Sequence, residues 1–348
     1  MKFGIIGTGM IAHFHARAIQ SIENASLHSV FSHTPQRAAE FASTHHCQNA
    51  STLEAFLADP DLEIVTIATP SGSHREPTLA ALNAGKHVIC EKPLEITPER
   101  IDLLIAAAQK KNVTLSAILN RRFNQPFSLL KQAVDQGRFG RITLCQASIP
   151  WFRSQAYYDS AAWRGTWKFD GGGALMNQAI HTIDQLISAV GPVKRVSATM
   201  SCLAHHHIEV EDTAVAIIEF EHGALGTIQA STACWSTTGH PAELHICGTQ
   251  GSAILSDESF RVWDFLKPTD DDAYVKKNLM ATAGSSGIGA NDPNAMNFSG
   301  HQKNVEHVMH AIQNHTPPTT DAHEARKAVA LICAIYESCR NDGQWISL

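Results

Sequence analysis

A run of three glycines leads directly into a predicted helix in the segment Gly171–Asp184, GGGALMNQAIHTID. On a helix, Asn177 and His181 are four positions apart, so their side chains project from the same face. A glycine turn at the start of the helix lets a ligand or another backbone approach closely. A histidine and an amide beside such an opening can bind a hydroxyl group and remove its proton. An ordinary helix with one structural histidine is the alternative.

A lysine follows the predicted strand Lys86–Cys90, in the sequence Glu91-Lys92-Pro93. Ligands of open α/β sheets bind at the carboxyl ends of the strands. The Lys92 side chain can therefore reach a ligand, and its charge can stabilise negative charge that develops on a substrate oxygen. We expect the catalytic residues to be Lys92, His181 as general base, and Asn177, which orients the substrate or the imidazole.

The first predicted strand, Lys2–Ile6, ends in Gly7-Thr8-Gly9-Met10-Ile11-Ala12, and a helical pattern follows. This is the G-x-G-x-x-A turn that receives the pyrophosphate of a dinucleotide. Gly7 allows the tight turn, and Gly9 lets the backbone reach the phosphates. A purely structural turn is the alternative. The residues expected to contact a cofactor here are Gly7, Thr8, Gly9, Met10 and Ile11.

No acidic residue directly follows the second predicted strand, Leu27–Phe31. A site for NAD usually has Asp or Glu at this point, bound to the ribose 2′-hydroxyl. Ser32, His33 and Arg37 suit a 2′-phosphate better, so the sequence favours NADP over NAD. The alternative is a simple polar turn beside an NAD that binds without an acidic partner.

The third predicted strand, Glu63–Ala68, ends in the sequence Thr69-Pro70-Ser71-Gly72-Ser73-His74. Its carboxyl end belongs to the same edge of the sheet as the other strand ends. We therefore expect five further residues to complete the cofactor site: Thr69, Pro70, His74, Glu91 and Lys92.

The length of 348 residues is too great for most single cores, which favours two domains. Strand and helix patterns alternate as far as Asn120, and strand patterns with short turns dominate beyond it. The predicted domains are 1–120, which binds NAD(P), and 121–348, which binds substrate. The strands predicted in the second domain are Arg141–Ile149, Arg195–Leu203, Thr213–Phe220, Ala224–Ser231 and Glu243–Cys247, and its closing helices are Gln302–Gln313 and Ala322–Arg340.

The motifs G-x-G-x-x-A, T-P-x-x-x-H, E-K-P and G-G-G-x-L-x-N-x-x-x-H, in this order and spacing, resemble the Gfo/Idh/MocA oxidoreductases. The resemblance implies an α/β Rossmann domain followed by an α+β domain with a large, mostly antiparallel open sheet. It implies a catalytic lysine at Lys92 and a catalytic histidine at His181, and a homodimer or homotetramer formed through the C-terminal sheet. Members of the family often have Asp where this chain has Asn177, whose amide cannot accept a proton.

Arginines and aromatic residues are unusually dense in Trp151–Trp167, WFRSQAYYDSAAWRGTW. Guanidinium groups suit a carboxylate or phosphate, and rings suit the apolar face of a sugar. The segment is similar to that of family members that oxidise sugar acids attached to UDP. A packed aromatic loop at a subunit contact is the alternative. The substrate-binding residues expected are Arg153, Tyr157, Tyr158, Trp163, Arg164, Asn177 and His181.

The composition is that of a globular protein, with 44% hydrophobic residues, 17% charged residues and a net charge of −6. No basic run exists to neutralise phosphates, which argues against nucleic-acid binding. No apolar run is long enough to span a bilayer, and no secretory signal pattern is visible. The eight cysteines are scattered without a C-x-x-C pair. These features predict a cytoplasmic protein that binds no membrane.

Histidine clusters in the second half of the chain are expected to hold no metal. His205, His206 and His207 are adjacent, and neighbours in an extended segment point to alternate faces. The histidines of the penultimate helix, His301, His307 and His310, are expected at a solvated or interface surface. The alternative for His301, which lies beside a predicted mobile loop, is contact with the substrate. The segment Ala281–Gly300, rich in glycine, serine and asparagine, is expected to be a mobile loop.

Two functions of different class fit these features. The first is a dehydrogenase that oxidises a secondary hydroxyl of a sugar or cyclitol by hydride transfer to nicotinamide. The second is a non-catalytic nucleotide-binding sensor on the same scaffold. The pairing of Lys92 with His181 favours the enzyme, because a sensor needs no proton acceptor.

Overall fold

The computed structural model describes residues 1–281 and 298–348. Contacts within the chain divide these residues into two compact units: Met1–Asn120 with residues 298–326, and residues 121–281 with Lys327–Leu348. Within the described residues, no helix is long and apolar enough to cross a membrane. The segment Ala281–Gly300, predicted as a mobile loop, lies almost wholly outside the described residues.

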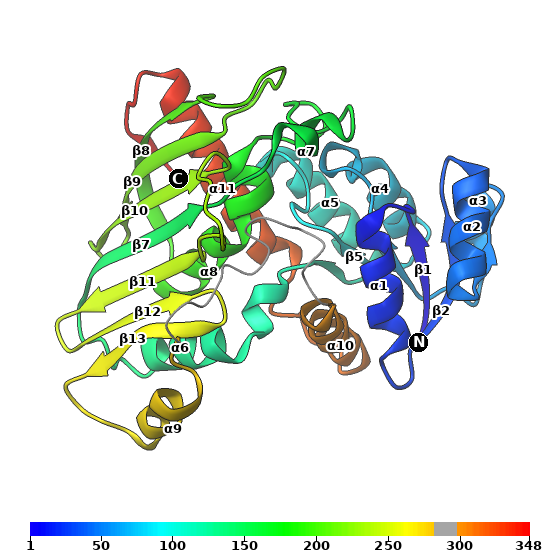
Figure 1. The fold of residues 1–348 in the computed structure, drawn as a ribbon. Helices are drawn as coiled ribbons and strands as arrows, with labels where there is room; N and C mark the ends of the chain where they lie inside the picture. The colour runs from blue at the N-terminus through cyan, green and yellow to red at the C-terminus, as the bar shows by residue number, and fades with distance from the viewer. Residues whose placement is uncertain (282–297) are drawn as a thin grey trace. The chain divides into compact units, whose positions relative to one another are not determined.

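The first unit contains a six-stranded parallel sheet in the order β3-β2-β1-β4-β5-β6 (Figure 1). The order changes direction between β1 and β4, which is the point at which doubly wound sheets bind nucleotides. The elements are β1 Lys2–Ile6, α1 Met10–Gln20, β2 Ser26–Phe31, α2 Pro35–His45, β3 Gln48–Asn49, α3 Leu53–Ala58, β4 Ile64–Ile67, the short helix η1 Ser71–Ser73, α4 Arg75–Asn83, β5 His87–Cys90, α5 Pro98–Lys111, β6 Leu115–Ala117 and α10 Ser299–Gln313.

The central strands of this sheet are apolar on both faces, because helices cover both sides of the sheet. Every residue of β4 is buried, as expected for a parallel strand that is covered on both sides by helices. The core extends from Phe3 and Ile5 of β1 to Ala12 and Ala16 of α1. Ala12 leaves room for the close approach of α1 to β1, as the glycine motif predicts.

Helix α10 belongs to the first unit, although it follows the second sheet in the sequence. Its Val305, Val308 and Met309 join the core that contains β1 and α1, and α10 lies beside α1 (Figure 1). The Asn304 side chain accepts a hydrogen bond of 2.9 Å from the backbone N–H of Leu119. The predicted second domain, 121–348, included this helix. The structure differs because the apolar face of α10 completes the core of the first unit.

The second unit contains an eight-stranded sheet in the order β13-β12-β11-β7-β10-β9-β8-β14 (Figure 1). All neighbouring pairs are antiparallel except β7 and β10, which run parallel. The predicted fold class is confirmed. The elements are α6 Gln125–Asp135, β7 Ile142–Pro150, α7 Gln155–Asp159, η3 Ala174–Ala179, α8 Ile180–Val190, β8 Val193–Ser201, β9 Thr213–Phe220, β10 Leu225–Ser231, β11 Glu243–Gly248, β12 Gly251–Ser256, β13 Ser259–Phe265, α9 Asp270–Asn278, α11 Ala322–Arg340, which starts in the first unit, and β14 Ile346–Ser347.

One face of this sheet is covered by helices and the other carries exposed apolar side chains. Helix α8 packs against β7 and β11, and α6 packs against α8 and β12. On the opposite face, Val215, Ile217 and Leu225 are exposed, and Leu144 is opposite Leu225 in the parallel pair. An antiparallel sheet that faces water normally alternates apolar and polar residues. On this face, large apolar residues therefore occupy several positions at which a sheet exposed to water would carry polar residues.

Candidate active site

The turn between β1 and α1 has the geometry of a phosphate-binding turn. Gly7 has φ of 114°, and a Cβ there would lie 2.4 Å from the carbonyl oxygen of Ala68. A Cβ at Gly9 would meet no atom within 4 Å, so the backbone faces open space. Helix α1 begins at Met10 without a side-chain cap, which leaves its N–H groups for an anion. These residues fit the pyrophosphate of a dinucleotide cofactor.

The residues after β2 form a polar, mostly exposed turn. The Ser32 hydroxyl lies 3.5 Å from the Thr8 hydroxyl and accepts a hydrogen bond from the backbone N–H of Thr34. His33 and Arg37 are exposed. The stretch contains a hydroxyl, an imidazole and a guanidinium, and its chemistry fits a phosphate group on the adenosine ribose.

His74 joins two loops at the carboxyl edge of the first sheet. Its imidazole is buried, with Nε2 2.9 Å from the carbonyl oxygen of Thr69 and Nδ1 2.8 Å from that of Pro93. Both ring nitrogens are thus engaged by backbone. His74 therefore links the loop after β4, which includes Pro70, to the loop after β5.

The end of β5 brings a buried carboxylate next to the predicted catalytic lysine. Glu91 is buried, Lys92 is half-buried, and the Lys92–Pro93 peptide is cis. The Glu91 carboxylate contacts two imidazoles, those of His15 and His301. Burial by itself raises the pKa of Glu91, but the two histidine hydrogen bonds outweigh it and hold the pKa well below its usual range.

The contact between Glu91 and His301 could not be predicted from the sequence. His301 was predicted at a solvated or interface surface, which is wrong, because its side chain is buried in the first unit. Its partner is 210 positions away in the chain. The pattern of one helix does not reveal a contact over that separation.

In the second unit, the glycine turn is held by a buried carboxylate. Glu211 accepts hydrogen bonds from the backbone N–H groups of Gly173 (3.0 Å) and Leu175 (2.9 Å) and from the Tyr336 hydroxyl (3.0 Å). A Cβ at Gly173 would lie 1.8 Å from the Glu211 carbonyl oxygen, so only glycine fits. Burial raises the pKa of Glu211 to about 7, although these hydrogen bonds oppose it.

The predicted helix is π-helical over Ala174–Ala179 and α-helical from Ile180. Asn177 and His181 lie on either side of this junction, and both are half-buried. A π-helical turn inside an α-helix is frequent at functional sites, because it changes the direction of the side chains that follow.

Asn177 is oriented by its neighbours. Its side-chain amide donates a hydrogen bond to Asp170, and its carbonyl oxygen accepts one of 2.8 Å from Gln178 Nε2. The second oxygen of the buried Asp170 accepts a hydrogen bond of 3.0 Å from the backbone N–H of Gly165. Asp170 was not among the predicted site residues. Its position directly before the glycine run was the available signal.

Arg153, expected from the sequence to bind the substrate, is buried with only 3% of its surface exposed. One guanidinium nitrogen donates to the Gln178 side chain at 2.7 Å and another to the backbone carbonyl of Phe152 at 2.8 Å. The Tyr157 hydroxyl accepts a hydrogen bond of 3.1 Å from Gln178. Arg153 is therefore joined to Asn177 through Gln178.

The remaining predicted substrate residues divide into a packed group and a more accessible group. Tyr158 is buried, with its hydroxyl 2.9 Å from that of Thr232. Arg164 is half-buried, with its guanidinium 4.1 Å from the ring centre of Tyr157 and 4.6 Å from that of Trp163. Of the two arginines, Arg164 has the more accessible charge.

The adjacent histidines do not form a cluster around one point. His205 is buried, with Nδ1 3.0 Å from Asp212 and Nε2 2.7 Å from the carbonyl oxygen of Arg153. His206 and His207 are exposed. His205 thus uses both ring nitrogens to hold the loop that contains Arg153.

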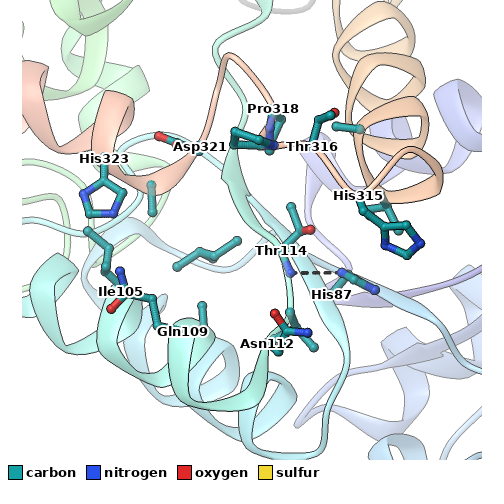
Figure 2. A pocket seen from close by; sticks show the side chains of 17 residues that line it. His87, Ile105, Gln109, Asn112, Thr114, His315, Thr316, Pro318, Asp321 and His323 are labelled. Carbon is teal, nitrogen blue, oxygen red and sulfur yellow. Dashed lines mark hydrogen bonds between the residues drawn. The ribbon is translucent and has the colours of Figure 1, made fainter.

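A cavity of about 400 Å³ lies in the first unit away from these residues (Figure 2). Figure 2 shows His87 and Thr114 in its wall, joined by a hydrogen bond of 3.0 Å from the Thr114 N–H to His87 Nδ1. His87 starts β5 and Leu115 starts β6, so the cavity is at the amino ends of these strands. The glycine turn and Lys92 follow strand carboxyl ends at the opposite edge.

Two family models match the chain. Residues 1–119 match the model described as "Oxidoreductase family, NAD-binding Rossmann fold". Residues 127–254 match the model described as "GFO/IDH/MocA C-terminal domain".

Individual proteins with the same architecture bind or act on different sugars. The WlbA dehydrogenase of Bordetella pertussis, solved in complex with NADH and UDP-GlcNAcA, is 32% identical, with 100% of this chain and 97% of that chain covered and a TM-score of 0.89. Levoglucosan dehydrogenase of Pseudarthrobacter phenanthrenivorans is 28% identical, with 74% of each chain covered. Myo-inositol 2-dehydrogenase of Thermotoga maritima is 29% identical, with 74% of this chain and 79% of that protein covered.

Proposed function

The chain belongs to the Gfo/Idh/MocA oxidoreductases and is a nicotinamide-dependent enzyme, and from this premise we propose that it oxidises a secondary hydroxyl group of a UDP-linked sugar acid. The observation that carries the proposal is the likeness to WlbA over the whole chain, together with Lys92 and His181 at the motif positions of the family. The membership disfavours a non-catalytic sensor.

The proposed chemistry divides between two side chains. The cofactor supplies the hydride acceptor, at C4 of its nicotinamide. His181 acts as the general base that accepts the proton of the substrate hydroxyl. Lys92 donates a hydrogen bond to the same oxygen and stabilises its developing negative charge. Asn177, whose amide hydrogen is directed to Asp170, presents its carbonyl oxygen as an acceptor and orients the hydroxyl without taking its proton.

The charge of Arg164 adds support to the substrate proposal. The guanidinium of Arg164 lies against two aromatic rings and is half-buried, which suits a carboxylate or phosphate held beside a sugar ring. The buried Arg153 has a different proposed task, which is to hold Gln178 and Tyr157 in place. The relatives named for levoglucosan and myo-inositol make a neutral sugar or cyclitol the second candidate.

The cofactor proposal is NADP in preference to NAD. Ser32, His33 and Arg37 follow β2 without an acidic residue, and an acidic residue would repel a 2′-phosphate. The solved WlbA complex contains NADH, so the discrimination has to be measured. Calorimetric titration with each cofactor tests it. Tighter binding of NADP that is weakened by Arg37→Ala is expected, whereas tighter binding of NAD that is unaffected by Arg37→Ala would contradict it.

We also propose that the open face of the second sheet is covered by another copy of the chain. Val215, Ile217, Leu225 and Leu144 are exposed on this face, and several large apolar side chains exposed on one face of a sheet are typical of an interface. Sedimentation of the wild type and Ile217→Lys tests this proposal. A wild-type dimer or tetramer that dissociates in the variant is expected, and a wild-type monomer would contradict it.

A substrate panel tests the function directly. The purified protein is mixed with NADP or NAD and with UDP-GlcNAcA, levoglucosan or myo-inositol, and the absorbance of the reduced nicotinamide is followed. We expect the highest kcat/KM with UDP-GlcNAcA. A higher value with a neutral substrate would contradict the sugar-acid proposal, and reduction with none of the three would contradict all of these substrate assignments.

A further inference from the structure

We propose that Glu91, held by His15 and His301, is a positioning residue that fixes the backbone of Lys92 for the hydride-transfer step. The inference rests on the proposed catalytic role of Lys92. It adds His15 and His301, which the sequence motifs do not indicate, and it gives Glu91, expected from the sequence to contact the cofactor, a positioning task. All four residues belong to the first unit.

The contacts connect Lys92 to two helices through one carboxylate. Glu91 Oε1 lies 2.9 Å from His15 Nε2 and 3.0 Å from His301 Nε2. The other oxygen, Oε2, accepts a hydrogen bond of 3.0 Å from the backbone N–H of Lys92. The Glu91 side chain has little freedom with all of these contacts. The peptide group between Glu91 and Lys92 is therefore held in one orientation.

The three side chains are buried, with 5% of Glu91, 0% of His15 and 6% of His301 exposed. Burying a carboxylate costs several kcal/mol unless hydrogen bonds compensate. A carboxylate is nevertheless suited to this place, because it is the side chain that can accept from two imidazoles and a peptide N–H together. A structural apolar residue would fill the space without directing the peptide.

The two histidines lie on different helices, and through Glu91 they connect Lys92 to both of these helices in the first unit. His15 is on α1, whose start forms the phosphate-binding turn, and His301 is in the first turn of α10. The ring centres of the two histidines are 5.4 Å apart, so they contact Glu91 side by side. The position of Lys92 is thus tied to the helix that begins at Gly9.

The protonation of the cluster follows from its hydrogen bonds. Because a carboxylate only accepts, each Nε2 must donate. The low pKa of Glu91 keeps it ionised, and burial lowers the pKa of His15, which favours its neutral form. A neutral His15 protonated at Nε2 has no proton at Nδ1. Neither Nδ1 has a hydrogen-bond partner among the described residues.

The same three groups have the composition of a divalent-metal site, since their ligand atoms lie within 4.8 Å of one another. The nitrogen–oxygen distances of 2.9 and 3.0 Å are those of N–H···O⁻ hydrogen bonds, which favours direct contact. Metal analysis of the purified protein distinguishes the two arrangements. A stoichiometric metal that is lost in Glu91→Gln would overturn the positioning proposal.

The kinetic test compares matched variants. In Glu91→Gln, an NH2 group replaces one carboxylate oxygen, so at least one of the three hydrogen bonds is replaced by two facing N–H donors. In His301→Leu, one hydrogen bond to Glu91 is lost, whereas His301→Gln retains an N–H donor at a similar reach. Each variant is measured with the most active sugar among UDP-GlcNAcA, levoglucosan and myo-inositol. The readouts are the single-turnover rate of hydride transfer, the Kd of the cofactor and the melting temperature.

We expect hydride transfer about 10- to 100-fold slower in Glu91→Gln and His301→Leu, because a misplacement of a catalytic group by about 1 Å can slow a reaction by about 100-fold. The cofactor Kd should change less than about threefold, and His301→Gln should recover most of the rate. A His301→Leu protein that folds and transfers hydride at the wild-type rate would overturn the proposal, even if Glu91→Gln fails to fold.

Lys92→Met, measured in parallel, separates this inference from the proposed function. Loss of hydride transfer in Lys92→Met, with normal rates in the Glu91 and His301 variants, would overturn the positioning role alone. Normal hydride transfer in Lys92→Met would overturn the proposed role of Lys92, and the inference with it.

Discussion

The side-chain amide of Asn177 donates a hydrogen bond to the carboxylate of Asp170, seven positions earlier in the chain. Members of the family that this chain resembles often have an aspartate at the position of Asn177. In this chain the carboxylate is instead supplied beside that position, from the residue before the glycine run. Asp170 is buried, and it accepts hydrogen bonds from Asn177 and from the backbone N–H of Gly165.

Replacing Asn177 by aspartate should place two carboxylates in contact. We expect Asn177→Asp to lower the free energy of unfolding at pH 8 by about 1–3 kcal/mol, because a charged hydrogen bond is replaced by repulsion. Part of the loss should be recovered at pH 5, where the pair can share a proton. Urea unfolding at the two pH values measures the effect.

The double variant Asp170→Asn with Asn177→Asp is the control, because it exchanges the two groups and restores one carboxylate. It should be more stable at pH 8 than Asn177→Asp alone, as a double-mutant cycle for a direct contact requires. Additive effects of the two substitutions would contradict the contact.

Glu211 should make stability fall as pH rises. Its pKa is raised to about 7 in the folded protein, from an ordinary value of 4.5, because it is buried. Between these values the folded state binds more protons than the unfolded state, so the free energy of unfolding decreases with increasing pH. The contribution is fully present below about pH 4.5 and is lost as pH rises through about 7.

Over this range Glu211 accounts for about 3 kcal/mol. Unfolding of the wild type and Glu211→Gln is compared at pH 5 and pH 8. The wild type should lose more stability between the two pH values than the variant. An identical pH dependence in both proteins would show that Glu211 titrates normally.

The accessible charge of Arg164 should govern the affinity for an anionic sugar. Arg164→Gln is expected to raise KM for UDP-GlcNAcA by the equivalent of about 1.5–3 kcal/mol, the value of a lost charged hydrogen bond. The KM for a neutral sugar should hardly change. Arg153→Gln serves as the comparison, because the buried Arg153 holds Gln178 and its loss should impair all substrates. Equal effects of Arg164→Gln on charged and neutral substrates would contradict the assignment.

The features that could be predicted from the sequence are those whose residues are close together in the chain. The Gly7–Ala12 turn and the lysine after β5 each occupy one short segment, where the spacing itself implies the geometry. The prediction that Asn177 and His181 share one face assumed an α-helix, whereas residues Ala174–Ala179 are π-helical, so the spacing alone does not give the direction of the two side chains. The fold class followed from the change in strand and helix patterns near Asn120. Asp170 also lies near the glycine run, but no periodic pattern links it to Asn177.

The features that could not be predicted depend on contacts between distant segments. Glu91 meets His15 across 76 positions and His301 across 210. Glu211 reaches the N–H of Gly173 across 38. A buried carboxylate looks like a surface residue in a single sequence, because charged side chains are usually exposed. The return of α10 to the first unit has the same cause, since an amphipathic helix does not specify which core it completes.

The turnover of His181→Ala most directly tests the proposal that the protein is a dehydrogenase in which His181 is the general base. The variant is measured with saturating cofactor and the best wild-type sugar, and cofactor binding is titrated separately. Because His181 is proposed to take the proton of the hydroxyl, we predict a fall in kcat of about 10²-fold or more, with an unchanged cofactor Kd. A variant that binds cofactor normally and turns over at nearly the wild-type rate would contradict the account.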